Sequence, residues 1–305
     1  MSEECEADNT PSCCATCGIA EVDDIKLVPC DECDLLKYCS DECQGNHKAE
    51  HKEACKQRID ELIRDELLFK QPESSHMGDC PICCLPLPLE MNKSTMMTCC
   101  SKLICKGCHC ANVIREKEMR LPHSCPFCRK ALPDTEEEIE KRMMKRIEAN
   151  DTAAIFFAGG EQYNKEEYIR AFEYWTKAAE LGDAQAHYKL SIMYHHGQGV
   201  EKDEERYMHH LEEAAIGGHP EARFLLGWHE NNNSNAERAV KHWIIAASQG
   251  EDDSIKMLMK AFRQGFISKD VLAAALRAHK AAVDETKSPQ REAVEELKCY
   301  RNNSC

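Results

Sequence analysis

The 305-residue chain lacks the apolar segments that would place it in a membrane or outside the cell. No apolar run approaches the ~18 residues that a membrane-spanning helix needs, so we expect no membrane association. Its first residues, Met1 to Asn9, are acidic and contain no basic-then-apolar secretion signal. These absences predict a reducing compartment, cytoplasmic or nuclear, where cysteine pairs bind metal rather than form disulfides.

Positive charge is also scarce. The chain has 39 Lys and Arg against 54 Asp and Glu, which gives a formal net charge of −15. A surface of this sign repels the phosphates of nucleic acids, and there is no basic stripe or finger-type helix to read DNA. We therefore expect no direct nucleic-acid binding. The segment from Cys80 to Leu132 is a local exception, with eight Lys or Arg and three Glu.

Residues for nucleophilic or phosphate-transfer chemistry are missing as well. No Ser-His-Asp or Cys-His set can be proposed, because the cysteines near histidines are the ones best explained as metal ligands. Gly159-Gly160 lacks the Lys-Ser/Thr that completes a phosphate loop.

Cysteine, in contrast, is abundant and ordered. Fifteen of the 21 cysteines, with one histidine, form two consecutive arrays of closely spaced pairs. A short turn brings two soft ligands onto one tetrahedral zinc ion, and a distant pair completes its shell. Eight ligands in each array predict four structural zinc ions. The first array is Cys14, Cys17, Cys30, Cys33, Cys39, Cys43, His51 and Cys55, and the second is Cys80, Cys83, Cys99, Cys100, Cys105, Cys108, Cys125 and Cys128.

The first array, with its "KYCSDECQGNHKAEHKEAC" segment, resembles the MYND zinc finger. The resemblance implies interleaved pairs, with Cys14, Cys17, Cys39 and Cys43 on one ion and Cys30, Cys33, His51 and Cys55 on the other. His51 and Cys55 lie one helical turn apart, whereas His47 is expected at the surface. Cys13 could substitute for Cys14, but Cys14 has the x2 spacing. By resemblance, the module binds proline-containing peptides.

The second array, with "CPIC", "CCSKLICKGC" and "CPFCRK", resembles a RING domain. The resemblance implies Cys80, Cys83, Cys105 and Cys108 on one ion, and Cys99, Cys100, Cys125 and Cys128 on the other. The usual histidine position holds Lys102, which cannot bind zinc while charged. We therefore assign the adjacent Cys99 and Cys100, and His109 and His123 are the alternatives.

A RING implies catalysis by positioning a ubiquitin-conjugating enzyme and its linked ubiquitin. By resemblance, Ile82 contacts that enzyme, Pro126 packs beside it, and Arg129 bridges enzyme and ubiquitin. Val113 or Ile114 would supply a further apolar contact. Ile82 and Pro126 could instead simply cover zinc sulfurs.

From about residue 151 the chain repeats itself. Ala-Ala pairs begin at 178, 214 and 246, each followed by a helix-ending glycine at 182, 218 or 250. The spacing predicts helix–turn–helix repeats of tetratricopeptide size, with Trp175, Trp228 and Trp243 in the core. The segment "AAELGDAQAHYKLSIMYHHGQGVEKDEERYMHHLEEAAIGGHPEARFLLG" resembles the SEL-like repeat family, whose superhelical scaffolds hold protein partners.

The predicted fold class is two small zinc-stabilised α+β modules followed by an all-α helical-repeat solenoid. The expected boundaries are a tail at 1–13, the MYND module at 14–55, a helix and linker at 56–78, the RING module at 80–133, a connecting helix at 134–150 opened by the capping box Thr135-x-x-Glu138, repeats at 151–286 and a polar tail at 287–305.

The leading functional hypothesis is a RING-type ubiquitin ligase whose MYND module and repeats recruit protein substrates or adaptors. The alternative is a non-enzymatic zinc-binding adaptor, possibly in transcriptional regulation.

Overall fold

The computed structural model describes residues 13–19 and 26–296, so the tail predicted at 1–13, apart from residue 13, and the part of the predicted polar tail at 297–305 lie outside the described residues. The chain divides into two compact units, Met1–Leu68 and Phe69–Cys305. No helix among the described residues is long and apolar enough to cross a membrane.

The first unit is built around sulfur rather than around aliphatic side chains. Strand β1 (Val28–Pro29) pairs antiparallel with β2 (Lys37–Tyr38), and helix α1 (Asp41–Phe69) follows. Its buried cluster contains only two residues that are not cysteines, Leu27 and Tyr38, beside Cys14, Cys30, Cys33 and Cys55. Because so little apolar surface is buried, the fold of this unit depends on what holds the sulfurs together.

Helix α1 differs from the short helix predicted after residue 55. It begins at Asp41, inside the first cysteine array, and runs without a break to Phe69. The apolar residues that predicted the later helix are its exposed part, since Leu62, Ile63 and Leu67 are 41–51% exposed. The boundary expected between the module and the helix therefore falls within one helix.

The second unit begins with the second cysteine module, residues 79–132. It contains η1 (Met91–Lys93), a hairpin of β3 (Ser94–Met97) and β4 (Lys102–Cys105), and helix α2 (Lys106–Met119). The hairpin places Ser94 opposite Cys105. Its buried cluster again mixes cysteines with a few aliphatic residues, of which Ile104 and Leu87 are the most enclosed.

Helix α3 (Glu136–Glu148) couples this module to the helices that follow. Thr135 caps it, as predicted, by accepting a hydrogen bond from Glu138 N at 3.3 Å. Met143 and Ile147 are buried in a cluster that continues into the first repeat. On the other side, Arg146 donates to the Cys99 carbonyl oxygen at 2.6 Å and Arg142 to that of Ala131 at 2.8 Å. Helix α3 therefore contacts both the cysteine module and the first repeat.

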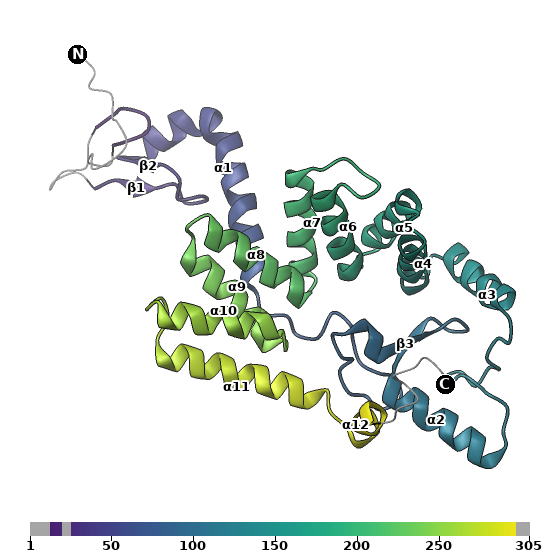
Figure 1. Ribbon diagram of the computed structural model, residues 1–305. Coiled ribbons are helices and arrows are strands. Elements are labelled where there is room, and N and C mark those ends of the chain that lie inside the picture. The colour runs from purple at the N-terminus through teal and green to yellow at the C-terminus, as the bar shows by residue number, and fades with distance from the viewer. Residues whose placement is uncertain (1–12, 20–25, 297–305) are drawn as a thin grey trace. The chain divides into compact units, whose positions relative to one another are not determined.

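The solenoid consists of four helix pairs that stack in chain order (Figure 1). The helices are α4 (Thr152–Asn164), α5 (Tyr168–Glu180), α6 (Ala184–His196), α7 (Glu204–Ile216), α8 (Pro220–Asn232), α9 (Ala236–Ser248), α10 (Asp252–Arg263) and α11 (Lys269–Glu285). The repeat glycines 182, 218 and 250 all have positive φ angles of 85–91°, as their position after each Ala-Ala helix predicted.

Two tryptophans fill equivalent places in this solenoid and the third does not. Trp175 and Trp243 are each 2% exposed, and their indole N–H groups donate to Phe156 O and Phe224 O. Trp228 is 52% exposed, so the prediction that it lies in the core was wrong. Trp228 follows Gly227, the residue that packs against Trp243, so its side chain leaves the helix on another face.

The segment predicted to be a free linker packs against the repeats. Gln71 donates to Ser248 Oγ at 2.7 Å, and the His76 ring lies 4.5 Å from that of His219. Gln185 hydrogen-bonds His76 Nε2 at 2.9 Å. The segment therefore follows the row of turns between successive repeats.

Candidate metal centres and interaction surfaces

The structure gathers sixteen cysteine and histidine side chains into four sets of four. Within each set all ligand atoms lie within 4.8 Å of one another. We name each set by its first cysteine. They are the Cys14 set (Cys14, Cys17, Cys39, Cys43), the Cys30 set (Cys30, Cys33, His51, Cys55), the Cys80 set (Cys80, Cys83, Cys105, Cys108) and the Cys99 set (Cys99, Cys100, Cys125, Cys128).

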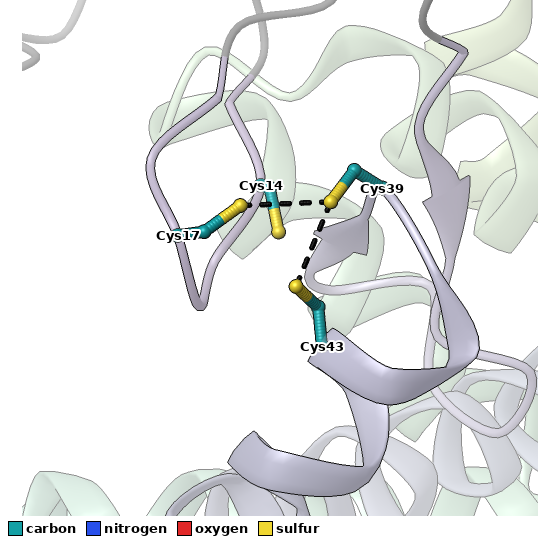
Figure 2. Close-up of side chains that lie close together, drawn as sticks. All are labelled: Cys14, Cys17, Cys39 and Cys43. Carbon is teal, nitrogen blue, oxygen red and sulfur yellow. Dashed lines mark hydrogen bonds between the residues drawn. The ribbon is translucent and has the colours of Figure 1, made fainter.

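In the Cys14 set, four thiols point toward one another from a turn, a strand end and a helix (Figure 2). Cys39 Sγ lies 3.5 Å from Cys17 Sγ and 3.6 Å from Cys43 Sγ. Cys39 follows β2, and Cys43 lies in the first turn of α1. Two segments far apart in the sequence thus meet at a point that one metal ion could occupy.

In the Cys30 set, all four residues are buried and one is a histidine. His51 Nε2 lies 3.1 Å from Cys33 Sγ, so this ring nitrogen faces the sulfurs. His47, one turn earlier, lies outside the set and hydrogen-bonds Tyr38 OH at 3.2 Å through Nδ1. His51 therefore lies among the sulfurs, whereas His47, expected at the surface, is half-buried against Tyr38.

The Cys80 and Cys99 sets interleave the pairs of the second array, first with third and second with fourth. Cys83 and Cys105 sulfurs lie 3.9 Å apart, and Cys128 and Cys99 sulfurs 3.3 Å apart. Adjacent Cys99 and Cys100 both reach the centre, because the chain turns at Ser101, whose φ is 54° and whose N–H donates to Met97 O. The alternative ligands lie outside the sets, and His123 instead contacts Glu116 at 3.3 Å.

Four Cys-x2-Cys turns share one backbone shape. In each, the residue after the second cysteine has a positive φ and donates its N–H to the first cysteine's carbonyl oxygen; these residues are Gly18, Asp34, Cys84 and Arg129. The shape points two sulfurs the same way, which is what a shared metal ion requires. Cys84 and Arg129 thus have a backbone role that the sequence analysis did not assign to them.

The thiols in these sets cannot all ionise without a cation. A hydrogen bond from Cys105 lowers the pKa of Cys80 to about 4. Hydrogen bonds to Cys17 and Cys43 raise the pKa of Cys39 to about 12. One thiolate at each centre makes the next more costly, because like charges at this distance repel. A divalent soft cation removes that conflict, and zinc with four protein ligands fits these donors as a structural ion.

The three residues expected to contact a conjugating enzyme differ in exposure. Ile82 is 41% exposed, Pro126 is buried, and Arg129 is exposed and donates to Asn112 Oδ1 at 3.4 Å. Of the two further apolar candidates, Ile114 is 42% exposed and Val113 is half-buried.

Beside Arg129 lies a buried polar network that sequence reasoning missed. Glu116 is 1% exposed and accepts hydrogen bonds from Ser124 Oγ at 2.7 Å and Asn112 Nδ2 at 2.9 Å. Burial opposes ionisation of Glu116, but the hydrogen bonds from Ser124, Asn112 and His123 lower its pKa. The network ties α2 to the last cysteine turn. A carboxylate inside an amphipathic helix carries no motif, so only the packing reveals it.

Comparison with known families identifies two parts of the chain. The MYND finger model matches residues 14–55, and the Sel1 repeat model matches residues 153–183, 184–219 and 220–251. The chain therefore contains a zinc-binding MYND finger and three Sel1 repeats. The fourth helix pair, α10 and α11, lies beyond the matched repeats.

The chain is similar to curated proteins over part of its length. It is 24% identical over 208 residues to DAP3-binding cell death enhancer 1 of Mus musculus and 23% identical to that of Rattus norvegicus; each match covers 55% of this chain and 40% of the relative. It is 30% identical over 86 residues to chitin synthase regulatory factor 4 of Schizosaccharomyces pombe, covering 28% of this chain and 14% of that protein. The chain thus spans less than half the length of these relatives.

The chain is similar to two solved structures over part of its length. A Sel1 repeat protein from Oxalobacter formigenes is 26% identical with a TM-score of 0.37, covering 40% of this chain and 97% of the other. A protective antigen of uropathogenic Escherichia coli is 21% identical with a TM-score of 0.37, covering 55% of this chain and 37% of the other.

Proposed function

We propose that this protein is a zinc-folded adaptor that brings protein partners together and does no covalent chemistry itself. The observation that carries the proposal is the combination of a MYND finger at 14–55 with Sel1 repeats at 153–251, two kinds of module associated with protein–protein interaction. We further propose that all four cysteine sets hold zinc, one ion each, and that the ions serve folding.

Exposed apolar side chains on the repeats support a binding surface there. Trp228 is 52% exposed on α8, Ile169 is 67% exposed on α5, and Phe266 is 61% exposed after α10. Large aromatic residues dominate the binding energy of protein interfaces. Trp228 is therefore the residue that we expect a partner to cover.

The mouse relative's name states that it binds DAP3, which supplies a defined partner to test. Purified DAP3 would be titrated calorimetrically with the full chain, with Trp228→Ala and with Trp175→Phe. The adaptor proposal expects binding that Trp228→Ala weakens at least ten-fold and that Trp175→Phe, a core change, leaves within two-fold. Equal binding by all three would exclude the Trp228 surface, and no binding would exclude this partner.

For the MYND module we propose that the ligand is an extended, proline-containing peptide. Val28 and Leu35 offer exposed apolar side chains, 55% and 50% exposed, beside the β1–β2 pair. A proline-containing peptide array would be probed with the full chain and with Val28→Asp. Loss of array binding in the variant with zinc content unchanged supports the proposal, whereas identical array patterns would exclude this face.

A second candidate function is ubiquitin ligation by the second cysteine module. The specific observation in its favour is the interleaving of the Cys80 and Cys99 sets, with Ile82 exposed in the first turn and Arg129 in the last. In this proposal the module holds a conjugating enzyme and its thioester-linked ubiquitin in a reactive pose, which is catalysis by positioning.

Self-ubiquitination of the zinc-loaded chain against a panel of conjugating enzymes tests this candidate. The variants would be Ile82→Ala and Arg129→Asn, since asparagine tolerates the positive φ of 62° at that position. Lys130→Ala, on the exposed neighbour, is the matched control. Chains that disappear in the two variants and persist in the control would establish a ligase. No chains with any enzyme, with zinc content intact, would leave the adaptor function alone.

A further inference from the structure

The last described helix, α12 (Pro289–Glu296), is not part of a free tail. It packs against α2 of the second cysteine module, which Figure 1 shows beside it. Ser288 Oγ caps it by accepting from Arg291 N at 3.3 Å. Lys93 of the module pairs with Glu295 of the helix at 3.4 Å. The polar tail predicted from residue 287 thus includes a docked helix.

One side chain of α12, Arg291, is almost enclosed by the module. Arg291 is 9% exposed. Its guanidinium donates to Pro86 O at 2.7 Å, Leu85 O at 3.2 Å, Thr286 O at 2.6 Å and Cys83 Sγ at 3.4 Å. The Cys105 thiol is another of its partners. The guanidinium of Arg291, about two hundred positions further along the chain, therefore contacts two of the four cysteines of the Cys80 set.

A second feature shows that the module is shaped to receive this helix. Gly107 lies between Cys105 and Cys108, and a Cβ there would meet Arg291 N at 2.8 Å and Arg291 Cγ at 2.9 Å. Any side chain at position 107 would therefore push α12 away from the cysteines. The glycine allows the two backbones to approach each other at the point where Arg291 enters.

We propose that α12 is a component of the metal centre formed by the Cys80 set, with Arg291 as its positioning residue. Zinc bound by four thiolates leaves a net charge of about −2 at a site whose ligands are buried or half-buried. The guanidinium offsets part of that charge, and its hydrogen bonds fix the sulfur of Cys83 and the turn that carries it. Outer partners of this kind typically change metal affinity about 10–100-fold. The proposal rests on the proposed zinc ion in the Cys80 set and is independent of which protein partners the chain binds.

Metal release and cadmium-113 NMR of the full chain test this inference. Arg291→Met removes the charge and the donors but keeps most of the stem. We expect one of the bound zinc ions to transfer to a chromophoric chelator about ten-fold faster. In the cadmium-loaded chain, the resonance of the Cys80 set, assigned with Cys83→Ser, should move while those of the other sets remain. Arg291→Lys, which keeps the charge, should restore part of the retention.

Two further variants separate metal tuning from general destabilisation. Gly107→Ala should displace α12 without changing Arg291 or any ligand, so it should also speed release. The double variant Gly107→Ala/Arg291→Met should then release zinc no faster than Arg291→Met alone. Arg142→Met is the matched control, since Arg142 donates to the Ala131 carbonyl oxygen of the same module but to no sulfur. It should leave the release rate and the Cys80 resonance unchanged.

The outcomes are distinct. Unchanged release and unchanged cadmium resonances in Arg291→Met would overturn the proposal, as would an equal effect of Arg142→Met. Absence of a Cys80-set resonance in the parent chain would overturn it together with the metal centre, while leaving the adaptor function standing. If Arg291→Met lowers the helical signal of the whole chain, Arg291→Lys and Gly107→Ala replace it as the test. Their zinc release rates and cadmium resonances then decide whether the proposal stands.

Discussion

Helix α1 carries two histidines one turn apart, His47 and His51, and they differ in what their ring nitrogens contact. His51 Nε2 faces Cys33 Sγ at 3.1 Å, whereas His47 Nδ1 bonds the Tyr38 hydroxyl. Their rings are stacked with centroids 6.0 Å apart, so the two histidines lie side by side on one helix. Only the direction of one ring nitrogen makes His51 a candidate ligand.

We expect His51→Ala to bind one zinc ion fewer per chain than the parent, because three cysteines alone do not complete the tetrahedral shell. His47→Ala should keep the parent stoichiometry. Native mass spectrometry counts the ions directly. If both variants lost the same number of ions, the distinction drawn between the two rings would be wrong.

Adjacent glycines in α4 offer an equally sharp contrast. A Cβ at Gly159 would lie 2.6 Å from the Trp175 ring, while a Cβ at Gly160 would meet nothing within 4 Å. We expect Gly159→Ala to lower the free energy of unfolding by about 1–3 kcal/mol through overpacking. Gly160→Ala should raise it by about 0.5–1 kcal/mol, since alanine favours a helix over glycine. Urea unfolding of the two variants checks both signs, and equal effects would contradict this packing.

Among the secondary-structure elements, the first helix of each successive repeat begins at an equivalent position, but the residue that caps it differs from repeat to repeat. Asp183 caps α6, His219 caps α8 and Glu251 caps α10. His219 Nδ1 accepts from Ala222 N at 3.3 Å, so that nitrogen must carry no proton. Burial, followed by the charges of His76 and Lys189, lowers the pKa of His219 well below its usual value. Burial likewise lowers the pKa of His76 to about 4.

These histidines predict an acid-sensitive repeat unit. Protonation favours the unfolded chain, where histidine has a pKa of about 6.5, over the folded one, where the pKa is lower. Their contribution is complete above about pH 6.5 and is lost as the pH falls toward 4. Tyr188, Lys189, Glu221 and His76 are the groups that face His219.

His219→Asn keeps a neutral cap and removes the titration, so we expect stability to fall less steeply between pH 6.5 and 4 than in the parent. Thermal unfolding across this pH range gives the slope, and His229→Asn, on the same helix, serves as the control for histidine loss. Parallel pH profiles for parent and His219→Asn would contradict the argument.

At the scale of the whole molecule, the first unit and the solenoid are stabilised by different forces. The unit Met1–Leu68 buries mainly cysteine, while the solenoid buries aliphatic and aromatic residues such as Leu190, Leu211 and Trp243. A module too small for its own core folds around its metal ions.

Chelation under reducing conditions should therefore unfold the first unit and the second cysteine module and leave most helices of the repeats. Circular dichroism should retain the majority of its helical signal after metal removal, with a cooperative thermal transition from the solenoid. Readdition of zinc should restore the remainder. Loss of all helical signal on chelation would show that the repeats depend on the metal, against the core described here.

The sequence by itself determined the elements whose signals are local. Cysteine spacing predicted the close ligand pairs, and the Ala-Ala-x-x-Gly period predicted the helix pairs and their turns. Which cysteine pairs share a centre was implied by the family resemblances. The capping box predicted the start of α3. In each of these cases the interacting residues lie within one turn or one repeat, whereas the joining of two distant cysteine pairs at one centre is a tertiary contact.

Only the tertiary structure decided the features that depend on contacts between distant segments. Trp228 is exposed because it lies one residue after Gly227, the residue that packs against Trp243. The repeat period alone does not distinguish the exposed Trp228 from the buried Trp243. The packing of His76 on His219 and of Arg291 on Cys83 joins segments with no shared pattern. Such contacts arise from shape and charge at one point in space, and a linear sequence does not record which distant residue will reach that point.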